Sequence, residues 1–425
     1  MATPPDYNHD NPPTLLVAGT LQGRAVDVDT SSIHPCEGRP ILLATLRPGR
    51  ALDLLCGGVA RTAAIKTTED DHTRVPRNPR REALLLAKLH HPNILSLLNA
   101  YLFEPTRASP IPRVTLFTPY YPHTLPDLLV SPAFTLGASP STFPALASSL
   151  AYQFVAAVAH LHDLGIAHRD INPANVVLSA RGRLVLIDLG IAVEAGAEKA
   201  GEMHFEIGTG PYRAPELIFA SRAYDPLALD LWALGATLAD LFRPLVYPRP
   251  PSPDSEDSFE RYYRQCTTPP PEPSLRRESL FEGAASDFVL AASVFRVLGT
   301  PTVKTWPEAA DLPTFSRFTF ASFPPTSLES LLPHLPPSAT ALLGIIESLL
   351  RISARERLSA SEARRRLEEA ETDPAARGGT ALLLPDDLDE RERSVYGSVG
   401  VARAGQAGLA PGEPLAEMLA VDRQE

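Results

Sequence analysis

Residues 166–190, IAHRDINPANVVLSARGRLVLIDLG, constrain the fold of this chain more than any other stretch. Two short apolar runs, Val176–Leu178 and Leu184–Ile187, lie on either side of a Ser-Ala-Arg-Gly segment. Aliphatic and β-branched residues that flank a glycine-containing turn predict a β-hairpin. With the turn centred on its Arg-Gly pair, antiparallel pairing places Asn175 opposite Asp188. Two oxygen ligands then meet at the open end of the hairpin, and Mg²⁺ prefers oxygen ligands that leave room for phosphates.

The same residues resemble the signature of the eukaryotic protein kinases. His168-Arg169-Asp170 matches the HRD motif, Asn175 stands at its asparagine, and Asp188-Leu189-Gly190 matches DFG. The resemblance implies that Asp170 is the catalytic base, that Asn175 and Asp188 hold Mg²⁺, and that ATP is the phosphoryl donor. The alternative is a chance HRD sequence on a helix-to-strand loop. The spacing, the hairpin and the flanking motifs together argue against chance.

Composition excludes several classes of function. A net charge of −11 over 425 residues argues against a nucleic-acid-binding surface and against binding to an anionic membrane. The cysteines Cys36, Cys56 and Cys266 show neither a disulfide framework nor metal-ligand spacing, which favours a reducing compartment, the cytoplasm or the nucleus. The polar, proline-rich N-terminus does not have the pattern of a signal peptide. The sequence has no uncharged apolar run of about 18 residues, so we expect no membrane-spanning segment.

Proline content and the loss of hydrophobic periodicity divide the chain. Proline occurs 44 times, about twice its average usage, which predicts long irregular loops or tails. The expected division is a loosely ordered arm over 1–39 with one strand at Leu15–Val17, a small antiparallel β-sheet lobe over 40–118, a larger mainly helical lobe over 119–370 with a disordered insertion at about 243–277, and a flexible tail over 371–425.

Hydrophobic patterns predict the main elements within these units. The expected helices are Asn78–Leu89, Leu146–Gly165, Leu227–Phe242, Ala285–Leu298 and Ala339–Leu350, and the expected strands include Arg61–Lys66, Ile94–Leu98 and Val114–Phe117. The kinase resemblance implies that these elements form the bilobal α+β protein-kinase fold. ATP then lies in the cleft between the lobes, and the hinge lies near residues 118–121.

Lys66 and Glu82 are a candidate ion pair. A partly buried lysine needs a counter-ion to keep its charge, and Glu82 on the next helix can supply it. Residues 81–95, REALLLAKLHHPNIL, resemble the helix C region of cyclin-dependent kinases. In kinases such a lysine, held by such a glutamate, grips the α- and β-phosphates of ATP. The alternative is a solvated surface pair.

The resemblance places further residues around the nucleotide. It assigns Ala64 to nucleotide binding and Phe117 to the back of the adenine pocket. The backbone groups of Thr118 and Tyr120 are expected to hydrogen-bond to adenine. An ordinary linker is the alternative interpretation of these last residues.

The phosphate-covering loop departs from the kinase pattern. Counting back from Lys66, the three family glycines fall at Ala44, Leu46 and Gly49, so only Gly49 is retained. Glycine lets backbone N–H groups approach phosphate closely, and side chains at the other two positions hinder that approach. We therefore expect a weaker grip on ATP or a flap of different shape.

Residues 207–216, IGTGPYRAPE, resemble the end of a kinase activation segment. By this resemblance Thr209 bonds the catalytic base, and Glu216 pairs with Arg357 to lock the segment to the helical lobe. Asp230 resembles a buried aspartate that bonds the backbone of the catalytic loop. A buried carboxylate on an apolar helix needs such partners, so we expect Asp230 to be structural.

The first part of the activation segment, residues 189–208, has no hydroxyl side chain for phosphorylation. His204 stands where cyclin-dependent kinases carry a phosphothreonine, and no Ser, Thr or Tyr occurs in Leu189–Gly208. Glu202 or Glu206 can supply a fixed negative charge to Arg169 instead. Activity is therefore expected to need no phosphate in this segment.

Asn172 is a further departure from the family pattern. Ser/Thr kinases usually place a lysine at this position, where it contacts the γ-phosphate of ATP. A missing charged donor can cost on the order of 10²–10³ in rate. Asn can still donate one neutral hydrogen bond to the phosphate.

Residues 298–307 and 351–360 narrow the resemblance to the cyclin-dependent branch, and matching motifs extend over 41–365. A degenerate glycine loop and an activation segment without a phosphosite occur together in the fungal monomeric cyclin-dependent-kinase-activating kinases. That family phosphorylates the activation loop of cyclin-dependent kinases. The resemblance implies a monomeric serine/threonine kinase with a protein substrate, and a cyclin-dependent kinase is one candidate substrate.

Two alternatives stay open. Of the cyclin-contacting segment, which falls on residues 77–82, only the final Arg-Glu matches, so a cyclin-like partner is not implied. Ala44, Leu46 and Asn172 favour a pseudokinase scaffold that binds partners without efficient phosphotransfer. An active enzyme is favoured by the presence of all the residues that the kinase motifs require, Lys66, Glu82, Asp170, Asn175 and Asp188.

Overall fold

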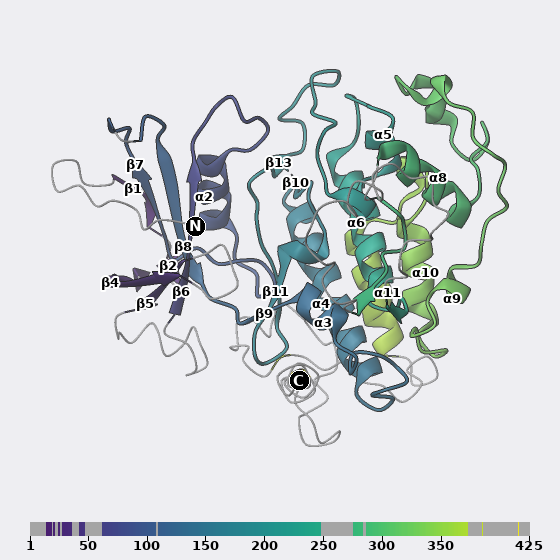
Figure 1. The fold of residues 1–425 in the computed structure, drawn as a ribbon, viewed down its shortest axis with the longest axis horizontal. Helices are drawn as coiled ribbons and strands as arrows, with labels where there is room; N and C mark the ends of the chain where they lie inside the picture. The colour runs from purple at the N-terminus through teal and green to yellow at the C-terminus, as the bar shows by residue number, and fades with distance from the viewer. Residues whose placement is uncertain are drawn as a thin grey trace, which may run out of the picture.

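The computed structural model describes residues 14–18, 20–21, 24–25, 28–35, 42–46, 62–107, 109–247, 275–283 and 286–372, together with Pro385 and Leu415. Within these residues a β-rich lobe lies at one end of the long axis and a helical lobe at the other (Figure 1). This two-lobed α+β architecture is the fold class that the sequence predicts. The retained glycine of the phosphate loop, Gly49, and the predicted tail beyond residue 372 lie outside the described residues, apart from the two single residues.

The β-rich lobe is built on one six-stranded antiparallel sheet in the order β1-β7-β8-β6-β5-β4. Its strands are β1 (Thr14–Ala18), β4 (Val28–Pro35), β5 (Leu42–Leu46), β6 (Thr62–Glu69), β7 (Asn99–Phe103) and β8 (Arg113–Pro119). A separate two-stranded ladder joins β2 (Thr20–Leu21) to β3 (Arg24–Ala25).

The sheet begins earlier in the chain than the sequence predicts. The predicted strand Leu15–Val17 lies within β1, but β4 also joins the sheet by pairing with β5. Strands from the segment 1–39, predicted to be a loose arm, therefore belong to the lobe. Residues 29–32 of β4 are polar, so a hydrophobicity pattern does not reveal this strand.

The strand predicted at Ile94–Leu98 is displaced. The structure has β7 at Asn99–Phe103, and Ile94 makes only an isolated bridge to Leu186. The apolar residues before β7 are nevertheless buried, because they pack into the core between the lobes. Burial alone therefore produced the strand-like pattern.

Helix α2 (Pro79–Lys88) packs against the sheet and carries Glu82 on its buried face. Asn78 caps the helix, since its side chain accepts a 2.8 Å hydrogen bond from Arg81 N, and proline occupies the first turn. The Asn78 N–H also donates to Gly190 O at 2.8 Å. The start of the helix is thus tied to the segment that contains Asp188.

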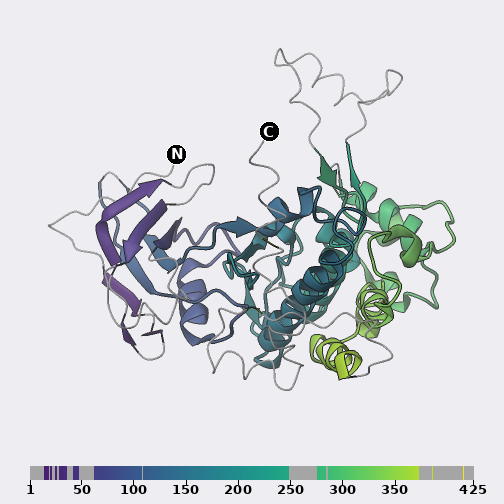
Figure 2. The ribbon, with the colours of Figure 1, turned by 90° about the horizontal axis from the view of Figure 1, so that it is seen from below.

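The helical lobe contains the four predicted helices and several short ones. Its helices are α3 (Leu125–Val130), α4 (Phe143–Asp163), α5 (Pro215–Ile218), α6 (Pro226–Asp240), α8 (Asp287–Leu298), α9 (Leu328–Leu331), α10 (Thr340–Leu349) and α11 (Ala360–Thr372). Short 3₁₀ turns are η1 (Pro173–Asn175), η2 (Gly210–Tyr212), η3 (Pro307–Asp311), η4 (Phe315–Arg317) and η5 (Ala354–Glu356). Figure 2 shows the long helix α4 crossing this lobe.

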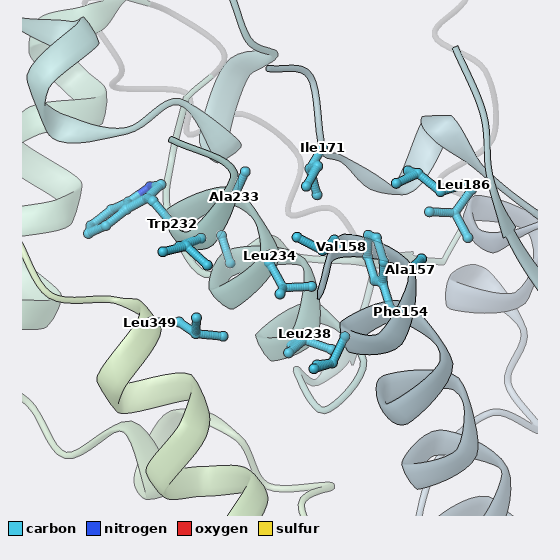
Figure 3. Packing of buried hydrophobic residues seen from close by; sticks show 14 of the residues in the cluster. Phe154, Ala157, Val158, Ile171, Leu186, Trp232, Ala233, Leu234, Leu238 and Leu349 are labelled. Carbon is cyan, nitrogen blue, oxygen red and sulfur yellow. The ribbon is translucent and has the colours of Figure 1, made fainter. Parts of the chain in front are cut away.

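Helix α6 lies at the centre of the core. Its Trp232 and Leu238 are fully buried, with Phe154 of α4 and Leu349 of α10 among their surroundings (Figure 3). A Cβ on Gly235 would come within 2.9 Å of the Leu349 Cβ, so glycine permits the close approach of α6 and α10. Ile171, next to Asp170 in sequence, belongs to the same buried cluster.

Helix α4 is long and apolar enough to cross a membrane by length and composition, a candidate that the sequence pattern did not reveal. In the structure, however, 78% of its apolar window is buried inside the lobe. The helix packs against α11, α6 and β12 (Leu184–Leu186). Its hydrophobicity is therefore accounted for by its place in the protein core.

The hairpin forms as predicted but in a different register. β11 (Val176–Leu178) pairs with β12 so that Val176 faces Leu186, and Ile187 N donates to Asn175 O at 2.9 Å. Asn175 is therefore opposite residue 187, one position short of Asp188. The turn has three residues and ends on Gly182, whose φ of 78° is the left-handed conformation that glycine favours.

Short strands complete this lobe. They are β9 (His123–Thr124), which pairs with β11, and the ladder of β10 (Ile166–Ala167) with β13 (Val193–Glu194). The predicted disordered insertion has ordered ends, since β14 (Leu245–Val246) pairs with β15 (Arg276–Arg277). Arg277 fixes this ladder by donating to backbone oxygens of Leu129, Leu241 and Arg243 at 2.8–3.0 Å. Residues 248–274 lie outside the described part.

Candidate active site

Lys66 is held between two carboxylates at the junction of the lobes. Its Nζ lies 2.8 Å from Glu82 Oε1 and 2.7 Å from Asp188 Oδ1. Lys66 comes from β6, Glu82 from α2, and Asp188 from the segment after β12. One ammonium group thus joins the sheet, the helix and the hairpin, and the structure brings together the pair that the sequence predicts.

The charges of Lys66 and Asp188 stabilise each other, whereas burial raises the pKa of Glu82. Burial by itself would lower the pKa of Lys66, but Glu82 and Asp188 outweigh burial and raise that pKa above its ordinary value. Burial would raise the pKa of Asp188, but the Lys66 ammonium outweighs it and the pKa is lowered to about 2. Both groups are therefore charged at neutral pH, and the site holds a fixed cation beside a carboxylate.

Asp170 is fixed by two neighbouring side chains. Thr209 Oγ1 donates to Asp170 Oδ1 at 2.6 Å, and Asn175 Nδ2 donates to Asp170 Oδ2 at 2.9 Å and to its carbonyl oxygen at 2.8 Å. Since the nitrogen of the Asn175 amide is directed at Asp170, the amide oxygen points away from it and can ligate a cation. The structure thus brings together the predicted base, its threonine and one predicted Mg²⁺ ligand.

Asn172 does not present a donor to a nucleotide. The residue is 2% exposed, and its Nδ2 lies 3.0 Å from Asp170 O, 3.1 Å from Asp170 Oδ1 and 3.3 Å from Thr209 Oγ1. Its Oδ1 accepts from Ala174 N at 2.9 Å, which caps η1. An amide nitrogen has only two hydrogens, and both are engaged. In this structure the amide nitrogen of Asn172 is therefore directed at Asp170 and Thr209, whereas the resemblance places a phosphate donor at this position.

Asp230 holds the backbone of the catalytic loop, residues 168–175. Its Oδ2 accepts from His168 N at 2.6 Å and its Oδ1 accepts from Arg169 N at 2.7 Å. Arg169 has a φ of 66°, a left-handed conformation that is costly for a residue other than glycine. The two hydrogen bonds from a buried carboxylate stabilise this backbone, which is the structural role that the sequence predicts for Asp230.

Arg169 is paired with Glu198 and not with Glu202 or Glu206, so that expectation is wrong. Its Nη1 lies 2.7 Å from Glu198 Oε2, and its Nε donates to Ile191 O at 2.7 Å. The Arg169 side chain is 0% exposed and that of Glu198 is 21% exposed. The activation segment therefore carries its own negative charge at Arg169, but from a residue nearer to β13.

Arg81 lies beside this pair. Burial, and next the neighbouring Arg169, lower the pKa of Arg81, whereas Glu198 acts in the opposite direction. Glu198 thus acts electrostatically on two arginines, one from α2 and one from the catalytic loop. Its charge partly offsets the repulsion between them, and the charge of Glu194 also favours the charged form of Arg81.

Glu216 and Arg357 form the predicted ion pair at the end of the activation segment. Both guanidinium nitrogens Nη1 and Nη2 lie 2.7 Å from the carboxylate oxygens, in a bidentate arrangement. The guanidinium also lies over the Trp232 ring at 5.2 Å from its centroid. The pair therefore anchors the segment to the core of the helical lobe.

The predicted hinge residues lie at the end of β8. Ala64 of β6 is the partner of Thr118, and Phe117 is 1% exposed beneath them. Tyr120 N donates to Thr62 O at 3.2 Å, so this N–H is engaged within the protein and does not face an adenine. The structure thus places Ala64, Phe117 and Thr118 together and does not support a Tyr120 N–H contact to the base.

Two residues near the site escaped sequence reasoning. Glu198 has the same residue type as its neighbours in the segment, and nothing local distinguishes it. Arg77 Nη2 lies 3.6 Å from Asp188 Oδ2, although Arg77 and Asp188 are more than a hundred residues apart in sequence. A positively charged residue before a helix N-cap is the only sequence signal at Arg77, and that signal is weak.

Similarity to known proteins covers most of the chain. A family model described as "Protein kinase domain" matches residues 57–366. Cyclin-dependent kinase 20 of Danio rerio is 34% identical over 204 residues, which are 47% of this chain and 49% of that protein. Cyclin-dependent kinase 7 of Xenopus laevis is 28% identical over 355 residues, 82% of this chain and 85% of that protein. The chain therefore spans about half the length of the cyclin-dependent kinase 20 relative.

Solved kinase complexes share the fold. The yeast RNA Pol II CTD kinase CTDK-1 complex matches with a TM-score of 0.57 and 21% identity, over 82% of this chain and 95% of that chain. The CAK complex of Chaetomium thermophilum bound to ATP-gamma-S matches with a TM-score of 0.58 and 20% identity, over 80% and 91%. Since the family model also covers well over half of the sequence, the chain belongs to the protein kinase domain family, whose cofactors are ATP and Mg²⁺.

Proposed function

We propose that this protein is a serine/threonine protein kinase of the cyclin-dependent type. The observation that carries the proposal is the position of Lys66, which lies within 2.8 Å of Glu82 and 2.7 Å of Asp188 at the same time. A degraded scaffold has no need to keep an ammonium group between two carboxylates from different elements. This arrangement fits ATP and Mg²⁺, because a charged lysine beside an oxygen ligand suits a metal-bound phosphate.

The residues of the catalytic loop account for the remaining chemistry. Asp170, with both carboxylate oxygens held by Thr209 and Asn175, can orient a substrate hydroxyl and accept its proton. Asp188 and the amide oxygen of Asn175 are the groups that would hold Mg²⁺, which neutralises charge on the phosphates when bound. In such a reaction catalysis consists mainly of positioning and electrostatic stabilisation.

We further infer that the substrate is the activation loop of a cyclin-dependent kinase. Similarity to cyclin-dependent kinase 7 over 82% of the chain supports this substrate class, as does the resemblance to the monomeric activating kinases. The Arg169–Glu198 pair supports activity without phosphorylation of the activation segment, because the arginine already has a carboxylate partner. We infer that the protein acts as a monomer in the cytoplasm or the nucleus.

A pseudokinase scaffold is the second candidate. The engaged donors of Asn172 favour it, since no side chain from that position reaches toward a phosphate. ATP binding by itself does not demonstrate an active enzyme, because a scaffold can bind ATP without transferring its phosphate. Only transfer of the γ-phosphoryl group does.

The experiment is a radiolabelled ATP assay with an unphosphorylated cyclin-dependent kinase as substrate. We expect labelling of its activation-loop residue by the purified protein and loss of labelling by about 10²-fold or more in Asp170→Asn, because the general base is removed. Asp163→Asn, on the exposed end of α4, is the matched control and should retain activity. Equal labelling by Asp170→Asn would refute the role of Asp170, and ATP binding without transfer to any protein would support the scaffold.

A further inference from the structure

Asp188 contacts two cations, of which Lys66 is explained by the proposed function and Arg77 is not. Lys66 Nζ lies 2.7 Å from Asp188 Oδ1, and Arg77 Nη2 lies 3.6 Å from Asp188 Oδ2. The side chain of Arg77 is 40% exposed. Arg77 therefore places a guanidinium at the predicted metal ligand while leaving part of that guanidinium open to another group.

The backbone of Arg77 is held in place on both sides. Arg77 N donates to Arg74 O at 3.1 Å, and the next residue, Asn78, donates to Gly190 O at 2.8 Å. Asn78 is also the N-cap of α2, the helix that carries Glu82. The backbone that carries the Arg77 guanidinium is therefore fixed relative to α2, the helix that carries Glu82.

Gly190 leaves the space that the guanidinium occupies. A Cβ at this position would lie 3.1 Å from Arg77 Nη1 and 2.9 Å from Asp188 Oδ1. Both distances are shorter than ordinary van der Waals contacts with carbon, so a side chain here would force the two groups to move. The absence of a side chain at residue 190 thus allows Arg77 to lie against the carboxylate.

The ion pair is loose enough for the guanidinium to serve a second partner. At 3.6 Å the Arg77–Asp188 contact is longer than a hydrogen bond, so the N–H groups of Arg77 are not committed to that carboxylate. Arg169, the other arginine beside the catalytic loop, is 0% exposed and paired with Glu198. Asn172, at the usual lysine position, is engaged by Asp170 and Thr209. Among these groups Arg77 is the exposed cation.

We propose that Arg77 binds the terminal phosphate of the nucleotide and supplies the positive charge that Asn172 lacks. The inference rests on the proposed function, because it assumes a nucleotide phosphate at Asp188. Arginine presents a planar fork of N–H donors that matches two phosphate oxygens at once. The cation enters from the start of α2 in the β-rich lobe, whereas a lysine at position 172 would enter from the helical lobe.

The test measures nucleotide affinity by titration calorimetry in EDTA, so that no metal ion contributes. Arg77→Ala should weaken ATP binding by about 10- to 100-fold, as expected for loss of a charge-assisted contact, while adenosine affinity stays within about twofold. ADP should lose less affinity than ATP in this variant, because the proposed contact is to the γ-phosphate, which ADP lacks. Arg77→Gln, which keeps most of the side chain, should show the same pattern.

Arg80→Ala is the matched control. Arg80 lies on α2, its side chain is also 40% exposed, and it pairs with Asp70. This variant should bind ATP like the wild type. Unchanged ATP affinity in Arg77→Ala would overturn the inference, and so would equal losses for ATP and adenosine, which would indicate a structural role.

The outcome is independent of the assay for the proposed function. If Arg77→Ala loses ATP affinity but the wild type transfers no phosphate, the inferred contact between Arg77 and the phosphate is supported and the proposed kinase activity is rejected. If the wild type transfers phosphate but Arg77→Ala binds ATP unchanged, the proposed kinase activity is supported and the inferred contact between Arg77 and the phosphate is rejected. Circular dichroism and the melting temperature of each variant show whether it is folded.

Discussion

Replacing Glu198 by glutamine removes one charge from the activation segment and little else. Glutamine has the same shape, and its carbonyl oxygen can still accept a hydrogen bond from Arg169. In the native protein the two side chains are 2.7 Å apart, with Arg169 fully buried and Glu198 21% exposed. The substitution therefore converts a charge-assisted hydrogen bond into a neutral one and removes one of the two carboxylates, Glu198 and Glu194, that favour the charged form of Arg81.

The size of the effect follows from this geometry. Hydrogen bonds to charged groups contribute about 1.5–3 kcal/mol and neutral ones about 0.5–1.5 kcal/mol, so the change costs about 1–2 kcal/mol. Arg169 stays tethered by its 2.7 Å hydrogen bond to Ile191 O, which limits the loss. If the cost falls on the ordered segment, kcat/KM decreases by about 5- to 30-fold.

The assay is the rate of phosphorylation of a cyclin-dependent kinase by Glu198→Gln and by Glu202→Gln. Glu202 lies in the same segment and is exposed, so its variant has the same change in net charge and should behave like the wild type. Proteolysis of the segment should become faster in Glu198→Gln only. Full activity of Glu198→Gln, or an equal loss in both variants, would refute the view that Glu198 takes the place of a phosphate.

Two further predictions concern stability. Asp230→Asn places an amide against the backbone N–H groups of His168 and Arg169, so at least one buried donor loses its acceptor, and the free energy of unfolding should fall by about 2–4 kcal/mol in urea titrations. Asp225→Asn, at the N-cap of the same helix, is the control and should change little, since either residue caps well; equal losses in both would contradict the anchoring role. The pKa of Asp188 is lowered from 3.8 to about 2, so its stabilising contribution, on the order of 2 kcal/mol, is fully present above about pH 5 and is lost as the pH falls through 4 toward 2. Lys66→Met removes the partner that lowers this pKa, and the stability difference between wild type and variant should shrink on acidification; a difference independent of pH would rule out this linkage.

Local patterns carried the sequence analysis a long way. Apolar residues every three to four positions located α4, and a run that is apolar on almost all sides located α6 as a buried helix. The wide apolar face of residues 78–89 likewise located α2. The spacing of Asp170, Asn175 and Asp188 identified the site, since these residues lie within one short segment around the hairpin.

The strand predictions were wrong where a local sequence pattern does not determine which segment a strand pairs with. The apolar residues from Ile94 to Leu98 resemble a strand, but they are buried in a connection, and the sheet pairing begins at Asn99. The polar strand β4 acquires its structure from pairing with β5 across the sheet. The hairpin register depends on a three-residue turn that ends at Gly182, which a symmetric two-residue turn does not anticipate.

The sequence by itself determined the family, the two-lobed fold and the identity of the residues that can do the chemistry. The tertiary structure decided where their side chains point: Asn172 toward Asp170, Glu198 toward Arg169, and Arg77 toward Asp188. Residue types and short spacings are properties of the chain. The direction of a charged side chain depends on which other charges the folded protein places around it, and those charges come from segments that are far apart in sequence.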